Sequence, residues 1–112
     1  MRRRAAARKD TVLLIEADSA RRAQLSIALA ASGLTVTAVS SIAEIERWPA
    51  GDVVVTDGDR FTPWWARVGA SHVIVLADSE QQGVAACELG ATAWVPRGCS
   101  PDLLVGTVRG LV

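Results

Sequence analysis

The feature that most constrains the fold is a regular alternation of short apolar runs with segments that carry helix-capping and helix-stop signals. The runs are Val12–Ile15, Val53–Thr56, Val73–Leu76 and Trp94–Val95, together with Leu34–Val39, which alternates apolar and polar residues as a half-buried strand does. Strands that alternate with helices along a chain pair in parallel, and the helices cover both faces of the resulting sheet. The sequence therefore predicts an α/β fold with a doubly wound, five-stranded parallel sheet.

Each apolar run is followed by residues that favour a helix, so five helices are expected. The predicted helical segments are 18–32, 41–49, 62–68, 79–90 and 100 onward. In the first, Asp18 or Ser19 is the N-cap and Gly33 stands in the stop position. The third helix is shortened, because few residues separate the two strands that it connects. Its Trp64 and Trp65 either cover the sheet or form a partner surface, where tryptophan is enriched.

Length and charge indicate one domain with a basic arm. The chain has 112 residues, enough for a single hydrophobic core, and Lys plus Arg equal Asp plus Glu at 12 each. Arginine and lysine crowd the first nine positions. We expect a flexible basic arm at 1–10 and a folded domain at 11–112. Such arms are most often solubilising and less often contact nucleic acid, so no nucleic-acid partner is expected.

Nothing in the sequence indicates secretion or membrane insertion. No apolar h-region follows the N-terminal arginines, and no run approaches the roughly 18 apolar residues of a membrane span. Cys87 and Cys99 lack both CxxC and zinc-site spacing, which favours reduced thiols packed as small hydrophobic groups. We expect a soluble, cytoplasmic protein with no membrane partner.

Charged residues follow the ends of four predicted strands. Glu16 and Asp18 follow the first strand, Asp57 ends the third, Asp78 follows the fourth, and Arg97 follows the fifth. Because the carboxyl ends of parallel strands meet at one edge of a sheet, these side chains are expected to converge there. Two acids and a cation at such an edge are the least that is needed to hold Mg²⁺ beside a phosphorylated carboxylate.

From about Thr11 to Val112 the chain resembles the receiver domains of bacterial two-component response regulators. The matching segments are Val12–Glu16, Asp52–Asp57, Val73–Leu76 and Glu88–Ala91, followed by Trp94. The resemblance implies the flavodoxin-like strand order 2-1-3-4-5. It also implies that Asp57 is the phosphoacceptor and that Glu16 fills the first of two acidic positions. Trp94 takes the place of an aromatic switch residue.

Two alanines occupy positions at which the resemblance implies functional side chains. Ala17 stands where a second carboxylate would ligate Mg²⁺. Only a weak Mg²⁺ site made by Glu16, Asp57 and waters is therefore expected, with Asp18 as an alternative ligand. Ala77 stands where a hydroxyl would hydrogen-bond the phosphoryl group. Because a ligand shifts a conformational equilibrium only through its differential contacts, this loss weakens switching.

The loop after the last strand also departs from the family pattern, since Arg97–Gly98 replaces Lys-Pro. A cis peptide without proline costs about 2.5–4 kcal/mol. We therefore expect a rebuilt loop, with Pro96 as the alternative position for a cis bond. Arg97 keeps the positive charge and is the nearest cation that can bridge Glu16 and Asp57. We predict that Arg97 permanently replaces the metal and locks the edge in one state.

The residues favour an atypical receiver module that acts in signal transduction mainly through protein–protein contacts, with weak or absent Mg²⁺-dependent phosphoryl switching. The alternative is a functional receiver that a sensor histidine kinase phosphorylates on Asp57. Neither enzymatic activity nor a cofactor other than weakly bound Mg²⁺ is expected. The expected partner is a sensor kinase or a downstream effector, or a second copy bound through the face formed by 79–90, Trp94–Val95 and the final helix.

Overall fold

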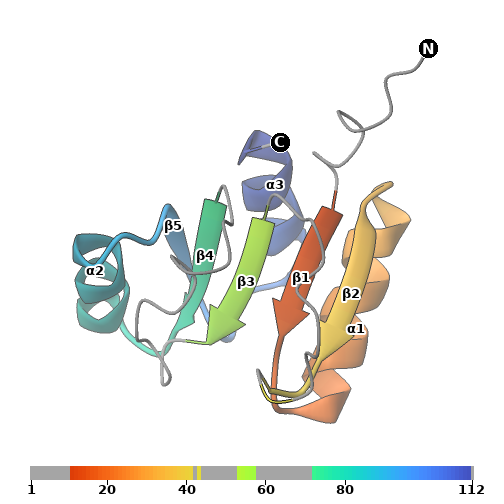
Figure 1. The fold of residues 1–112 in the computed structure, drawn as a ribbon, viewed down its shortest axis with the longest axis horizontal. Helices are drawn as coiled ribbons and strands as arrows, with labels where there is room; N and C mark the ends of the chain where they lie inside the picture. The colour runs from red at the N-terminus through yellow and green to blue at the C-terminus, as the bar shows by residue number, and fades with distance from the viewer. Residues whose placement is uncertain (1–10, 42, 44–52, 58–71, 112) are drawn as a thin grey trace.

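A computed structural model describes residues 11–41, 43, 53–57 and 72–111 of the chain. Five parallel strands form one sheet in the order β2-β1-β3-β4-β5 (Figure 1). The strands are β1 (Thr11–Ile15), β2 (Thr35–Val39), β3 (Val53–Asp57), β4 (His72–Ala77) and β5 (Ala93–Pro96). The predicted parallel sheet and the strand order implied by the resemblance are both confirmed.

Three helices lie among the described residues: α1 (Ser19–Ala31), α2 (Glu80–Glu88) and α3 (Pro101–Leu111). They correspond to the predicted helices at 18–32, 79–90 and 100 onward. Nearly all of the predicted helix at 41–49, the whole of that at 62–68, and the arm at 1–10 lie outside the described residues. Within the described part of the chain, no helix is both long enough and apolar enough to cross a membrane.

The ends of α1 are set by the residues that the sequence places there. The Asp18 carboxylate accepts a hydrogen bond from Arg21 N at 3.0 Å, which satisfies one of the free amides of the first turn. At the other end, Leu34 N donates to Leu29 O at 3.3 Å. Gly33 makes this turn possible with a φ of 94°, which L side chains rarely adopt. The chain then enters β2 directly.

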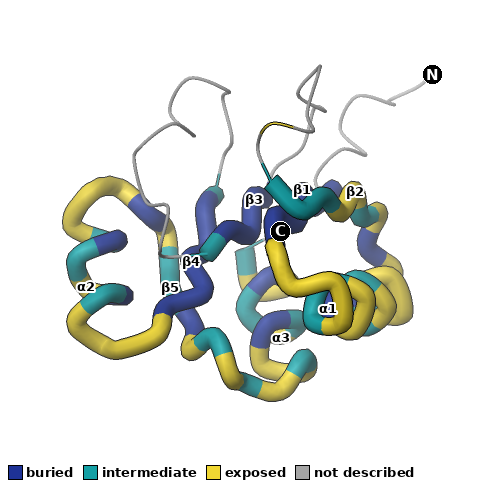
Figure 2. Tube along the Cα trace, turned by 90° about the horizontal axis from the view of Figure 1, so that it is seen from below, coloured by how far each residue is buried: buried dark blue, intermediate teal, exposed yellow. Residues whose placement is uncertain are grey.

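The central strands of the sheet, β1, β3 and β4, are buried on both faces, whereas the edge strand β2 is largely exposed. Val12 and Leu14 of β1 pack with the apolar side chains of α1 and α3, and Leu13 and Ile15 pack on the opposite face with Ala86 of α2. The central strands β1, β3 and β4 are almost entirely buried, and Figure 2 shows α1 and α3 together on one side of the sheet. Burial on both faces explains why these central strands appear in the sequence as nearly continuous apolar runs.

Candidate functional site

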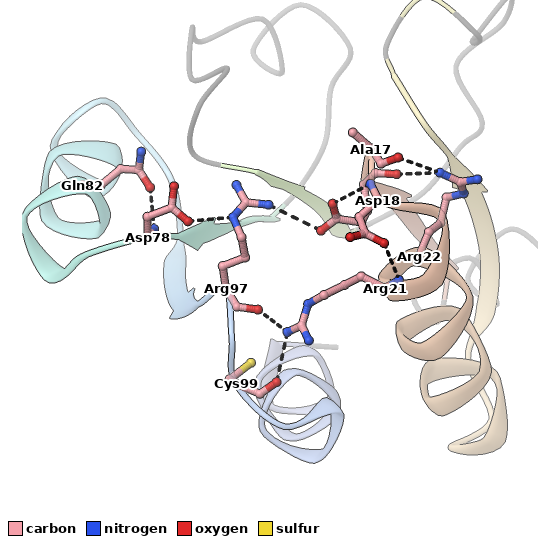
Figure 3. Close-up of polar contacts among 9 residues, drawn as sticks. Ala17, Asp18, Arg21, Arg22, Asp78, Gln82, Arg97 and Cys99 are labelled. Carbon is pink, nitrogen blue, oxygen red and sulfur yellow. Dashed lines mark hydrogen bonds and ion pairs between the residues drawn. The ribbon is translucent and has the colours of Figure 1, made fainter.

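The carboxyl ends of β1, β3, β4 and β5 bring charged residues to one edge of the sheet (Figure 3). Ala77 ends β4 and pairs with the last residue of β5, and Arg97 N donates to Ala77 O at 2.8 Å. Asp78 and Arg97 therefore leave the sheet side by side. Asp57 ends the neighbouring β3, and Glu16 follows β1.

Arg97 pairs with two acids at this edge. Its Nε donates to Asp78 Oδ1 at 2.8 Å, and its Nη1 lies 3.5 Å from Glu16 Oε1. The side chain of Glu16 is 3% exposed, whereas that of Asp78 is 54% exposed. Because β3 lies between β1 and β4, the guanidinium connects the ends of two strands that are not neighbours.

The surroundings of Arg97 favour its charged form. Partial burial lowers the pKa of Arg97, but the hydrogen bond and charge of Asp78, together with the charges of Asp57 and Glu16, outweigh that effect and raise the pKa above its ordinary value. The guanidinium is thus a permanent cation. The ion pair with Glu16 is present in the structure, whereas the role of Arg97 as a permanent replacement for a metal ion stays a prediction. Asp78 is a further partner, which sequence reasoning placed at the edge without giving it a role.

Glu16 is held in place by the β1–α1 loop. Its Oε2 accepts a hydrogen bond from Asp18 N at 3.1 Å, and Arg22 Nη1 donates to the Glu16 carbonyl at 2.9 Å. Its Oε1 is buried and accepts no hydrogen bond from the described residues, and Arg97 forms an ion pair with it. A buried carboxylate is stable in its charged form only if it is paired, so Glu16 depends on Arg97.

The described residues offer Mg²⁺ a poor set of ligands. Ala17 contributes only a methyl group, Asp18 uses Oδ1 to cap α1, and Glu16 is paired with Arg97. Within the described ranges, no group of three or more His, Cys, Asp or Glu side chains is arranged to hold a metal ion. Because Mg²⁺ requires near-octahedral oxygen ligation, this donor set does not fit tight binding, and weak binding that involves Asp57 stays a prediction.

Two cavities open at the edge, and each is lined by one of the two alanines. One has a volume of about 320 Å³ and is lined by Ala77 together with Arg21, Asp78, Arg97 and Gly98. The other, of about 170 Å³, includes Ala17, Asp57, Thr56 and the hydroxyl-bearing Ser40 and Ser41 in its lining. Both altered positions therefore border space that a ligand at this edge would occupy.

Trp94 is fixed by a close approach between α2 and β5. A Cβ atom built on Gly83 would lie 2.1 Å from Trp94 Cδ2, so α2 can approach the indole only because residue 83 has no side chain. Trp94 is half-buried and packs against the apolar cluster on this face of the sheet. The predicted switch aromatic is thus a packing element of α2 and β5 in this structure.

The loop after β5 is held by a residue that sequence reasoning missed. The described residues contain no cis peptide bond, so Pro96 does not carry one. Arg21 Nη2 donates to the carbonyl of Arg97 and, at 3.0 Å, to that of Cys99. A signal was present in the sequence: Arg21 and Arg22 lie in a first helical turn, where the helix dipole disfavours positive charge.

Comparison with known proteins supports the fold. No protein-family model matches the sequence, and no curated protein matches it. A Francisella response-regulator receiver domain matches with a TM-score of 0.74 and 17% identity, over 92% of this chain and 96% of that one. A response regulator from Burkholderia multivorans matches with a TM-score of 0.67 and 26% identity, over 92% and 94%.

A third structure is of an atypical orphan response regulator, described as revealing a phosphorylation-independent regulatory mechanism. It matches with a TM-score of 0.71 and 20% identity, over 89% of this chain and 92% of that one. The chain therefore has the fold of response-regulator receiver domains, as the resemblance implied.

Proposed function

We propose that the chain is an atypical receiver module in signal transduction that acts mainly through protein–protein contacts, with weak or absent Mg²⁺-dependent phosphoryl switching. The observation that carries this proposal is the position of Arg97. Its guanidinium pairs with Glu16 and Asp78 at the edge where the resemblance implies a metal ion and a phosphoryl group. An edge whose buried acid already has a permanent counter-ion gains little from a metal ion.

The free energy that a phosphoryl group would need to supply to switch the conformation also supports weak or absent switching. Moving a two-state equilibrium from 1:99 to 99:1 requires about 5.5 kcal/mol of differential binding. A hydrogen bond to a charged group contributes roughly 1.5–3 kcal/mol, and Ala77 forfeits the one that a hydroxyl would make. Ala17 likewise lacks the carboxylate that would ligate the metal ion. The contacts left to a phosphoryl group on Asp57 are therefore too few to drive a large change of state.

The proposed partner is a protein, either a sensor kinase or a downstream effector, and the proposed location is the cytoplasm. A second copy of the chain is a further candidate, through the face formed by α2, β5 and α3. The likeness to an atypical orphan regulator with a phosphorylation-independent mechanism supports this class of function by its fold alone. The edge residues that the structure describes include no nucleophile paired with a general base, which favours a binding module over an enzyme.

The second candidate function is a working receiver that accepts a phosphoryl group on Asp57 from a sensor histidine kinase. The observation in its favour is that Asp57 is half-buried rather than enclosed, ends β3 and lines the 170 Å³ cavity. A small phosphodonor could reach such a carboxylate from the solvent.

Treatment with acetyl phosphate and Mg²⁺, followed by intact-mass measurement, separates the two functions. We expect little or no adduct on the native chain and more on the variant with Ala17→Asp and Ala77→Ser, which restores both missing groups. Asp57→Asn is the negative control. A stoichiometric adduct at Asp57 of the native chain, with a beryllofluoride-induced change in Trp94 fluorescence, would overturn the proposal in favour of the working receiver.

A further inference from the structure

Two consecutive arginines in the first turn of α1 bind the loops that carry the charged edge. Arg22 Nη1 donates to the carbonyls of Glu16 at 2.9 Å and Ala17 at 3.4 Å, both in the β1–α1 loop. Arg21 Nη2 donates to the carbonyls of Arg97 and Cys99 in the loop after β5. Figure 3 shows the two side chains directed to different loops. One helical turn thus fixes both loops at this edge.

A positively charged side chain near the N-terminus of a helix is unfavourable unless other contacts offset the repulsion. The amide groups of the first turn give the helix N-terminus a partial positive charge, which repels cations. Carbonyl oxygens that have no partner in a regular element offset this repulsion when they accept hydrogen bonds from the guanidinium. The position of Arg21 is therefore unfavourable for the stability of α1 itself, and its hydrogen bonds to the backbone carbonyls of the loop after β5 offset that cost.

The contact of Arg21 with residue 97 is made to the backbone, whereas the ion pairs of residue 97 are made by its side chain. Arg97 N is fixed to Ala77 O at 2.8 Å, and Arg21 fixes the carbonyl of the same residue. With both ends of the backbone unit held, the Arg97 Cα–Cβ bond has a defined direction. That direction sends the side chain toward Asp78 and Glu16.

We infer that Arg21 is a positioning residue, which orients Arg97 for its ion pairs by holding the loop after β5 from α1. This inference rests on the proposed function only in that it explains how the edge is kept in one state. Arg21 also lines the 320 Å³ cavity together with Arg97, so a loosened loop would open the cavity and release the guanidinium into it.

The test is the Nε–H signal of Arg97 in nitrogen-proton NMR spectra, assigned through its loss in Arg97→Lys. In the native chain this N–H group donates a hydrogen bond to Asp78 Oδ1. In Arg21→Ala we expect its exchange with solvent to accelerate by at least about tenfold, the factor that corresponds to losing a hydrogen bond made by a charged donor. Arg21→Lys, which can still donate to a carbonyl, should restore part of the protection.

Arg109→Ala is the matched control, because Arg109 is an exposed arginine that donates to a carbonyl, that of Ser32, at 2.6 Å and has no contact with the edge among its described hydrogen bonds. It should leave the Arg97 signal unchanged. If Arg21→Ala does not fold, Arg21→Lys and Arg21→Met supply the comparison. An Arg97 signal that exchanges at the native rate in folded Arg21→Ala or Arg21→Met would overturn the inference. Adduct formation with acetyl phosphate in the native chain would overturn the proposed function alone.

Discussion

The interior of the sheet and its carboxyl edge follow different rules. The interior is made of aliphatic side chains from β1, β3 and β4 that are almost fully buried, such as Leu14 and Ile74 at 0% exposure. The edge is made of acids and arginines. Among the described residues there, Arg97 pairs with a carboxylate, and Arg21 and Arg22 donate hydrogen bonds to backbone carbonyls of the adjoining loops. The interior explains why the chain folds. The edge carries the charged contacts that we propose hold it in one state.

The largest effect on stability is expected from a substitution in the interior of the sheet, which should leave the contacts of the edge intact. Leu14→Ala removes a side chain that is completely buried between the sheet and the helices α1 and α3. We expect the free energy of unfolding, measured with urea, to fall by about 2–5 kcal/mol. The Arg97 Nε–H signal should keep its native exchange protection in this variant under conditions where it is folded. Loss of that protection would mean that interior and edge are one coupled unit.

A smaller effect is expected where the interior meets the predicted switch residue. Gly83→Ala places a methyl group within van der Waals overlap of the Trp94 indole. We expect a loss of about 1–3 kcal/mol from overpacking, together with a shift in Trp94 fluorescence in a background that lacks the other tryptophans.

Gly106→Ala in α3 is the control for this substitution, because a Cβ there meets nothing within 4 Å. It should raise the free energy of unfolding by about 0.4–1 kcal/mol, through a smaller loss of backbone entropy. If the two substitutions behaved alike, the close contact between α2 and Trp94 would not exist in solution.

The smallest effect on stability is expected at the edge position that lacks a carboxylate. Ala17 is exposed, so Ala17→Asp should change the free energy of unfolding by no more than about 0.5 kcal/mol. It should nevertheless tighten Mg²⁺ binding by about tenfold, since it adds a charged oxygen ligand beside Asp57. Isothermal titration calorimetry measures this difference. Equal Mg²⁺ affinity of the variant and the native chain would show that residue 17 does not face the metal position.

The difference between the interior and the carboxyl edge also explains which features could be predicted from the sequence. The apolar runs and helix signals such as the capping residue Asp18 predicted the strands and the described helices, because period and capping are local properties. The resemblance supplied the strand order. The pairing of Arg97 with Asp78 was not predicted, since it depends on the register between β4 and β5, which no local pattern specifies. The role of Arg21 depends in addition on where α1 lies beside the loop after β5.

The central claim is that Arg97 stabilises the edge by neutralising Glu16, and a double-mutant cycle in urea unfolding at neutral pH tests it most directly. Arg97→Ala should lose about 1–3 kcal/mol, because it leaves a buried carboxylate unpaired. Part of this should return with Asp57→Asn or in millimolar Mg²⁺. With Glu16→Gln as the second mutation, we predict a coupling energy of about 1 kcal/mol or more. Additive effects of the two substitutions, with no response to Mg²⁺, would contradict the account.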